Sequence, residues 1–305
     1  MRRAAGHGRR RWISLAALPL LLPGLWGCSY AGSSSGGKIV AVAGENFYGD
    51  LVARVGGERV LVTSIISDPS VDPHTYESSP QNAEAVADAT LVVENGLGYD
   101  AFLDRLLAAS PRSDRRVVNV QQLLNLPDGS NTHVWYDPAT MPKVARAVAD
   151  ALEQIDPGSK ASFEANLRTY LDSFGPFTAR IAEIKVRFPG TAVAYTEPVP
   201  GYLVAALGFR SLTPQGFAKA IENGTDPAPG DVAAEQDLLT GHKVSLLLYN
   251  SQATSPVTES IKALAGQSGV PVVGLSETIP RQDESFVQWQ LAQLNEIETA
   301  LGGSP

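Results

Sequence analysis

Two of the four histidines lie in loops where a metal ion could bind. His74 follows an apolar segment at 59–66 that is typical of a strand, and His133 stands just before a predicted helix. Imidazole nitrogens are common ligands of divalent transition metals. Either histidine alone could instead be packed among loop carbonyls, but two in similar loops favour one shared ion, since a metal site needs several converging ligands. His7 lies near the N-terminus and His242 between a helix and a strand, so we expect neither to be a ligand.

Two carboxylates follow predicted strands in the second half of the chain. Glu197 comes directly after 191–196, and Glu277 comes just after 271–275. Each could be a solvated loop charge, but the carboxyl ends of parallel strands are also where ligand sites form. Two imidazoles and two carboxylates suit a borderline or hard divalent metal. Cys28 is the only cysteine, and it lies far from these residues in the sequence, which argues against copper(I) and iron–sulfur clusters.

Strands and helices alternate in two regions, and this pattern predicts parallel sheets built from βαβ units. In the first region we expect strands at 38–43, 59–66, 91–94 and 116–120, with helices at 46–55, 99–109 and from Ser79-Pro80. In the second we expect strands at 191–196, 243–249 and 271–275, with helices at 201–207, 230–240, 256–267 and 285–301. The predicted class is α/β, with two (βα)4-type lobes of mostly parallel sheets and a metal site in the cleft between the lobes.

A long helical stretch separates the two regions. Its apolar residues recur every three or four positions from about 159 to 188, a length of roughly 45 Å if the helix is continuous. Gly175-Pro176 lies inside it and predicts a kink or a break. We therefore expect an N-terminal lobe at 38–157, a connecting helix at 158–188 and a C-terminal lobe at 189–305.

The N-terminus has the pattern of an export signal. Five arginines precede an apolar run at 12–26 that is short and interrupted by prolines, unlike a permanent membrane span. Cys28 follows a small residue at the end of this run, as in a bacterial lipobox, so we expect a signal peptide at 1–27 and acylation of Cys28. An ordinary signal peptide with an incidental cysteine is the alternative, and the arginines fit a twin-arginine signal less well. Residues 28–37 would then tether the protein to the extracytoplasmic face of the cell membrane.

The composition excludes some classes of function. The chain has 305 residues and a formal net charge of −8, with 18% charged and 44% hydrophobic residues, as expected of a globular protein. An acidic chain is a poor candidate for binding nucleic acid, because phosphate recognition requires clustered Lys and Arg.

These features together resemble the metal-binding lipoproteins of zinc and manganese ABC importers, the cluster A-I solute-binding proteins (family 9). The resemblance covers nearly all of the chain after Cys28. The segments that carry it are 72–77 (DPHTYE), 91–96 (LVVENG) and 133–138 (HVWYDP), together with the closing helix. It implies two α/β lobes joined by a long helix, a monomer, and delivery of one divalent metal to an ABC permease.

The resemblance also implies a ligand set. His74 and His133 would be the ligands from the first lobe, Glu197 would be the third ligand, and Glu277 would stand where the family usually has Asp. The His-rich loop of many zinc-specific members is missing from the sequence before His133. Glu as third ligand points to manganese, but zinc binds such donors more tightly by the Irving–Williams order. We therefore expect zinc or manganese as cargo, with ferrous iron third.

Two other functions are compatible with parts of the pattern. A metal-dependent surface hydrolase would need an open coordination position and a base, for which Glu197 or Glu77 could serve. The sequence contains neither HExxH nor GxSxG, so we expect a binding protein and not an enzyme. A surface adhesin that uses the lipid anchor and the aromatic segments is the third possibility.

Overall fold

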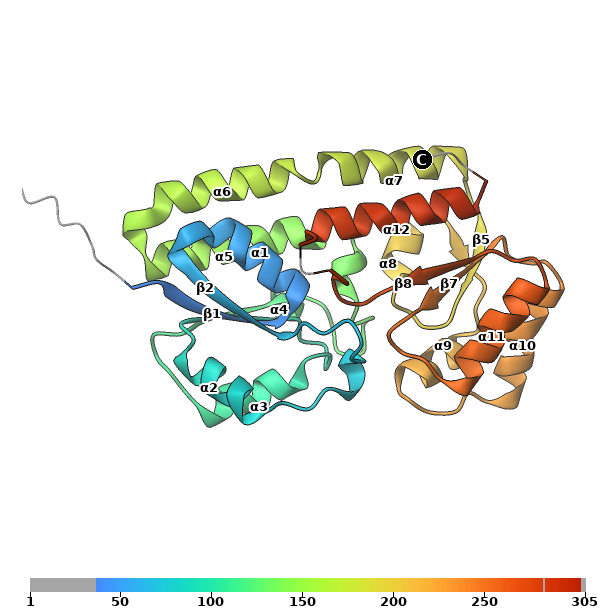
Figure 1. Ribbon diagram of the computed structural model, residues 1–305, viewed down its shortest axis with the longest axis horizontal. Coiled ribbons are helices and arrows are strands. Elements are labelled where there is room, and N and C mark those ends of the chain that lie inside the picture. Colours follow the sequence, from blue (N-terminus) through green and yellow to red (C-terminus); the bar gives the residue numbers. More distant parts are fainter. Residues whose placement is uncertain (1–36, 282, 303–305) are drawn as a thin grey trace, which may run out of the picture. The chain divides into compact units, whose positions relative to one another are not determined.

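The computed structural model describes residues 37–281 and 283–302. The predicted signal peptide, Cys28 and nearly all of the predicted tether lie outside these residues. Residues Gly36–Pro305 group as one compact unit that contains two sheets of four parallel strands each. The two sheets have the same strand order, β2-β1-β3-β4 and β6-β5-β7-β8 (Figure 1). The predicted class, two α/β lobes with parallel sheets, is confirmed.

Helices pack against both faces of the first sheet, whose central strand β1 is largely buried. Its strands are β1 (Ile39–Glu45), β2 (Val60–Ile66), β3 (Leu91–Glu94) and β4 (Arg116–Asn119). The helices around it are α1 (Asn46–Gly56), α2 (Pro80–Asp88), α3 (Ala101–Ala109), α4 (Val120–Leu124) and α5 (Thr140–Ile155), with 3-10 turns η1 (Gly57–Arg59), η2 (Pro73–Thr75) and η3 (Val134–Tyr136). Ala41 and Ala43 face the cluster that contains α1 and α5, whereas Val42 faces α2 and α3. This alternation explains why β1 is apolar at nearly every position.

The second sheet repeats this arrangement. Its strands are β5 (Ala192–Tyr195), β6 (Arg210–Ser211), β7 (Leu246–Asn250) and β8 (Val272–Leu275). Its helices are α8 (Gly201–Ala206), α9 (Gln215–Glu222), α10 (Pro229–Thr240), α11 (Pro256–Gln267) and α12 (Phe286–Ala300). Two of these elements, β6 and α9, were not predicted. β6 has only two residues, too few to show a pattern, whereas the apolar spacing of the eight-residue α9 (Phe217, Ala218 and Ile221) was overlooked.

The stretch between the sheets forms two helices. After η4 (Pro157–Ser159), α6 (Lys160–Asp172) is followed by α7 (Gly175–Arg187), so the predicted interruption is confirmed. Pro176 lacks a backbone N–H and therefore suits the first turn of a new helix. α12 lies beside α7 (Figure 1), and Glu298 of α12 accepts hydrogen bonds from Arg180 at 2.6 Å and Arg187 at 2.7 Å.

One hydrophobic cluster runs through both lobes. It includes Phe47 of α1 and Trp135 of η3, whose rings stack with centroids 4.5 Å apart, and Trp289 of α12, 6.3 Å from the Phe47 ring. Val193 of β5 belongs to the same cluster. The interior is thus shared between the lobes, and the boundaries at 157 and 188 stay a prediction.

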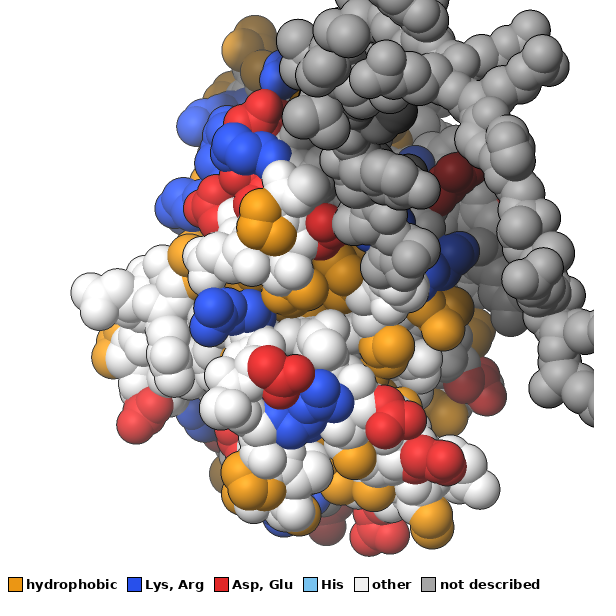
Figure 2. All heavy atoms as spheres, turned by 90° about the vertical axis from the view of Figure 1, so that its left-hand side faces the viewer, with side chains coloured by type: hydrophobic (Ala, Val, Ile, Leu, Met, Phe, Trp, Pro, Cys, Tyr) orange, Lys and Arg blue, Asp and Glu red, His pale blue; other side chains and the backbone are white. Residues whose placement is uncertain are grey.

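The end of the molecule near the start of α6 carries charges of both signs. Figure 2 shows Lys and Arg side chains lying among Asp and Glu side chains on this face. Lys160 pairs with Glu153 and with Glu164, the latter at 3.0 Å, and Arg59 pairs with Asp156 at 2.6 Å. These ion pairs neutralise charges near the start of α6. Among the described residues, no helix combines the length and the apolar run needed to cross a membrane.

Candidate metal centre

His74 is held by a short 3-10 turn that follows β2. Asp72 caps this turn by accepting a hydrogen bond from the backbone N–H of His74 at 2.9 Å, and Pro73 fixes the first position of the turn. The His74 ring packs edge-on against Tyr99 and His133, with ring centroids 5.2 Å and 5.4 Å away. These contacts point the imidazole of the loop inward.

His133 is fully buried just before η3. Asn131 Oδ1 lies 2.8 Å from His133 Nδ1 and also accepts a hydrogen bond from the His133 backbone N–H at 3.1 Å. Because an amide oxygen only accepts, this contact places a ring proton on Nδ1, so Nε2 is the nitrogen that would bind an ion. Second contacts of this kind orient histidine ligands in metal sites. Trp135 packs edge-on beside the ring at 5.3 Å.

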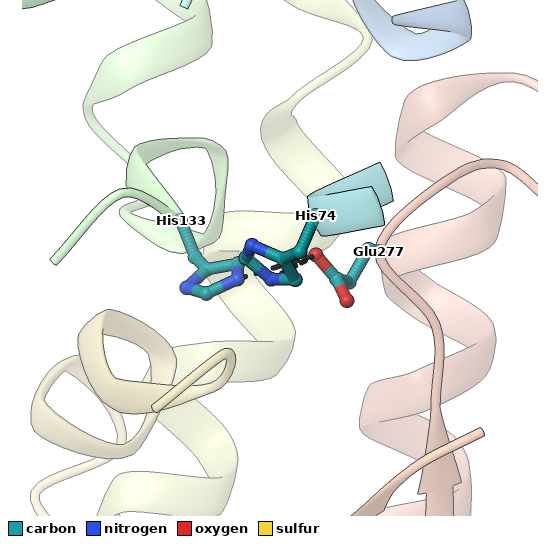
Figure 3. A group of neighbouring side chains, drawn as sticks. All are labelled: His74, His133 and Glu277. Atoms are coloured by element: carbon teal, nitrogen blue, oxygen red, sulfur yellow. Dashed lines mark hydrogen bonds and ion pairs between the residues drawn. The ribbon is translucent and has the colours of Figure 1, made fainter. Parts of the chain in front are cut away.

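Glu277, two residues beyond β8, brings a carboxylate to both imidazoles. Its Oε2 lies 3.2 Å from His133 Nε2 and 3.3 Å from His74 Nε2 (Figure 3). One donor atom from each of these three residues lies within 4.8 Å of the others. Residues that are far apart in the sequence and lie in different lobes therefore converge on one point.

The spacing of these atoms matches metal coordination. Two ligand atoms that each lie about 2.1 Å from one ion at the tetrahedral angle are about 3.4 Å apart. The two measured contacts of Glu277 Oε2, 3.2 and 3.3 Å, are close to that value. The buried Nε2 of His74 makes no hydrogen bond with proper geometry to any described residue. The three groups could therefore bind an ion with small movements of their side chains.

Glu197 lies beside this cluster but outside the three-residue group. It follows β5 and is 1% exposed. Asn250, at the end of the neighbouring strand β7, donates to Glu197 Oε2 and, at 2.8 Å, to Glu277 Oε1. The other oxygen, Glu197 Oε1, is buried and has no hydrogen-bond partner among the described residues. That orphaned oxygen is the kind of group a cation would satisfy.

The carboxylates and His74 shift each other's protonation. Burial alone would lower the pKa of His74, but contact with Glu277 and its charge outweigh it and raise the pKa to about 9. Burial would raise the pKa of Glu277, yet His133 and His74 hold it well below its usual range. Burial, together with the charge of Glu277, raises the pKa of Glu197 to about 8. A protonated His74 thus balances Glu277 when no ion is bound.

Two cavities reach these groups from different sides. Glu197 lines a cavity of about 250 Å³ together with Asp72 and Asp226. His74 lines another of about 220 Å³ that also contains Glu222. The cavities thus border His74 and Glu197, whereas His133 and Glu277 line neither of the two.

Sequence reasoning missed the residues that hold the ligands in place. Tyr99 donates to Glu277 Oε2 at 2.8 Å, and Asn250 bridges both carboxylates. The only sequence signal for Asn250 was a polar residue at the end of an apolar strand. His242, predicted to be outside the site, is exposed in the turn after α10, with a φ of 49°.

Comparisons with known proteins identify the family of this chain. The family model ZnuA, described as zinc-uptake complex component A periplasmic, matches residues 41–300. Manganese-binding lipoprotein MntA of Halalkalibacterium halodurans is 28% identical over 262 residues, which cover 82% of this chain and 85% of the relative. The manganese ABC transporter substrate-binding lipoprotein scaA of Streptococcus gordonii is 24% identical, with 85% of this chain and 86% of the relative covered.

Solved structures have the same fold. The periplasmic zinc-binding protein TroA from Treponema pallidum superposes with a TM-score of 0.75 at 20% identity, covering 87% of this chain and 99% of that structure. The Mn-bound periplasmic metal-binding protein from Candidatus Liberibacter asiaticus gives a TM-score of 0.70 at 19% identity, with coverage of 87% and 100%. Since the family model matches most of the residues that the structure describes, the chain belongs to the ZnuA family of metal-uptake components.

Proposed function

We propose that this protein captures one divalent transition metal, zinc or manganese, outside the cytoplasm and delivers it to an ABC importer. The observation that carries the proposal is the convergence of donor atoms from His74, His133 and Glu277 within 4.8 Å of one another. Relatives named as manganese ABC transporter substrate-binding lipoproteins support it.

The proposed ligands are His74 Nε2, His133 Nε2, Glu277 and Glu197. The ion would replace the proton on His74 and would satisfy the orphaned oxygen of Glu197. A site in which protein groups fill four positions leaves no place for a reacting water, so the donor set favours binding over hydrolysis. We therefore propose transport and not catalysis.

The donor set is compatible with both metals. Two nitrogen and two oxygen donors suit zinc, and the oxygen share also suits manganese. Relatives are named for manganese, and TroA is named for zinc. Because zinc outcompetes manganese at most such sites, metal supply in the cell decides the cargo as much as affinity does.

Cys28 is the proposed lipid anchor, and an ABC permease is the proposed partner of a monomeric protein with no role for nucleic acid. Two relatives are named as lipoproteins, which supports the anchor. Cys28→Ala should move the protein from the membrane fraction to the soluble extracytoplasmic fraction. Retention in the membrane fraction would contradict the anchor.

Competition titration with a fluorescent chelator tests the site directly. His133→Ala should lose most of its zinc and manganese affinity, whereas His242→Ala, which changes an exposed histidine, should bind as the unaltered chain does. In a host that lacks this gene, growth under zinc or manganese starvation should return with the unaltered chain and not with His133→Ala. Full binding by His133→Ala would refute the site.

A further inference from the structure

Helix α1 of the first lobe holds the loop that follows Glu277. Asn46 Nδ2 donates to the carbonyl oxygen of Ile279 at 2.8 Å, and the Ile279 backbone N–H donates to Asn46 Oδ1 at 3.0 Å. One turn further, Asp50 Oδ2 accepts from the backbone N–H of Phe286 at 3.1 Å. Residues four apart lie on one face of a helix, so both side chains reach the same segment.

The loop is therefore fixed from both lobes. On the side of the second lobe, Gln252 Oε1 accepts from the backbone N–H groups of Glu277 and Thr278, the latter at 2.8 Å. On the side of the first lobe, Asn46 forms hydrogen bonds with both the N–H and the C=O of Ile279, the residue after Thr278. Glu277 thus lies at the end of a strand whose continuation is hydrogen-bonded to the opposite lobe.

We propose that Asn46 is a positioning residue for Glu277: its two-point contact with Ile279 sets where the Glu277 carboxylate lies relative to the histidines. The inference rests on the proposed function, because it treats Glu277 as a ligand. Asn46 touches no donor atom itself in the contacts described, so its effect on metal binding passes through the loop.

The chemistry of the contact explains the residue type. An amide side chain donates and accepts in one plane without a change of protonation, which matches the backbone N–H and C=O of a single residue. An aspartate would keep the acceptor for the Ile279 N–H but would lose the donor to its carbonyl. The shape of the contact resembles one rung of a strand pairing, and so it fixes both position and orientation.

The surroundings of Asn46 favour a local effect when the contact is removed. Asn46, Asp50 and Ile279 line a cavity of about 610 Å³. If the amide is removed, water can reach both backbone groups of Ile279, so neither is left buried without a partner. We therefore expect Asn46→Ala to fold but to hold Glu277 less well.

A double-mutant cycle in the full chain separates positioning from general destabilisation. The variants are Asn46→Ala, Glu277→Ala and both together, and zinc affinity is measured by chelator competition. The matched control is Asn166→Ala, because Asn166 Nδ2 also donates to a backbone carbonyl across two elements, Val55 at 3.1 Å, but lies in α6. Thermal unfolding without metal and the visible spectrum of the Co²⁺-loaded protein are recorded for each variant.

We expect Asn46→Ala to weaken zinc binding roughly 10–100-fold. In the Glu277→Ala background the same change should alter affinity by no more than about twofold. The Co²⁺ spectrum should change in Asn46→Ala and not in Asn166→Ala, even where their unfolding temperatures fall equally. An equal loss in both backgrounds, or a variant indistinguishable from Asn166→Ala, would overturn the positioning role. Unaltered zinc binding by Glu277→Ala would instead overturn the proposed site itself.

Discussion

The two lobes have the same strand order but present their proposed ligands in different ways. In the first lobe the donors come from loops: His74 lies eight residues beyond the end of β2, and His133 stands before a 3-10 turn. In the second lobe the donors lie almost on the sheet, since Glu197 and Glu277 each follow a strand by two residues. A carboxylate borne by a strand end has a nearly fixed place, whereas a loop histidine depends on the contacts that orient it.

The equivalent strands β1 and β5 of the two lobes each lead to a buried carboxylate, Glu45 and Glu197. The order in which strands are added to the sheet reverses between β1 and β3 and between β5 and β7. Open α/β sheets bind ligands at such reversal points. Glu197 follows β5 at this point and shares the hydrogen-bond donor Asn250 with Glu277, whereas Glu45, the last residue of β1, has no hydrogen-bond partner for either carboxylate oxygen among the described residues. Burial, with the charges of Asp100 and Glu94, raises the pKa of Glu45 well above its usual range. The two strand ends occupy equivalent positions, but of the two carboxylates only Glu197 is linked to Glu277 through Asn250.

The largest effect should come from the strand-borne carboxylate that touches both histidines. Glu277→Gln keeps the size of the side chain and removes its charge, so zinc affinity should fall at least about 100-fold, or about 2.7 kcal/mol. Chelator competition measures this change, with Glu183→Gln on the exposed side of α7 as the control. Equal affinities for the two variants would mean that Glu277 is not a ligand.

Protons on both lobes should compete with the ion. With a pKa of about 9, His74 is protonated below that pH, and Glu197, at about 8, is protonated below 8. Both protons must leave before these groups bind, so affinity should rise with pH, by up to about tenfold per unit for each proton. Titrations at pH 6, 7 and 8 give the slope, and Glu197→Gln should reduce it. A dissociation constant independent of pH would contradict both assignments.

Removal of the second strand-borne carboxylate should change metal preference more than total affinity. Glu197→Gln should weaken manganese binding about tenfold, or about 1.4 kcal/mol, and zinc binding less, because the harder ion depends more on charged oxygen. Parallel titrations with the two metals provide the ratio. An equal loss for both would indicate that Glu197 contributes only general charge.

The smallest expected effect lies away from the site, in the second lobe. Burial raises the pKa of Glu235 to about 8, although a hydrogen bond from Thr213 at 3.2 Å acts against it. The folded state therefore binds this proton more tightly than the unfolded state, and stability falls as pH rises from about 4.5 to 8.

Glu235→Gln should abolish that loss. Its melting temperature should match that of the unaltered chain near pH 4.5 and exceed it at pH 8, by about 2–4 °C for each kcal/mol recovered. Thermal unfolding with a chelator present measures the difference. If Glu235→Gln instead melted at a lower temperature than the unaltered chain at pH 8, the ionised carboxylate of Glu235 would be stabilising the folded protein, contrary to the raised pKa.

Local patterns were enough to predict most of the fold. The alternation of apolar runs with amphipathic stretches predicted both sheets, and Gly175-Pro176 predicted the break between α6 and α7. Three short elements, α4, β6 and α9, were not predicted, and such short elements depend on packing against neighbouring strands and helices. Helix ends differed from the predicted ends by a residue or two, as at α3, where Tyr99 and Asp100 precede the first helical residue.

The candidate site, like the fold, has one part that the sequence predicts and one part that it does not. The proposed ligands stand out in the sequence because their types and loop positions suit metal binding, and their role stays a prediction. The groups that orient them do not stand out. Tyr99 meets Glu277 across 178 residues, and Asn46 meets Ile279 across 233. Such contacts depend on how the lobes pack, which no short segment encodes.

Asn131 joins the two halves at one of the histidines. Its Oδ1 holds His133 Nδ1, while its Nδ2 donates to the carbonyl oxygen of Pro198, three residues before the start of α8, at 2.7 Å. The Tyr202 hydroxyl donates to the Asn131 carbonyl at 3.1 Å. Any motion that separates these segments frees the amide to rotate and unlocks the tautomer of the imidazole. Separation of the two lobes would then by itself lower the affinity of His133 for the bound metal.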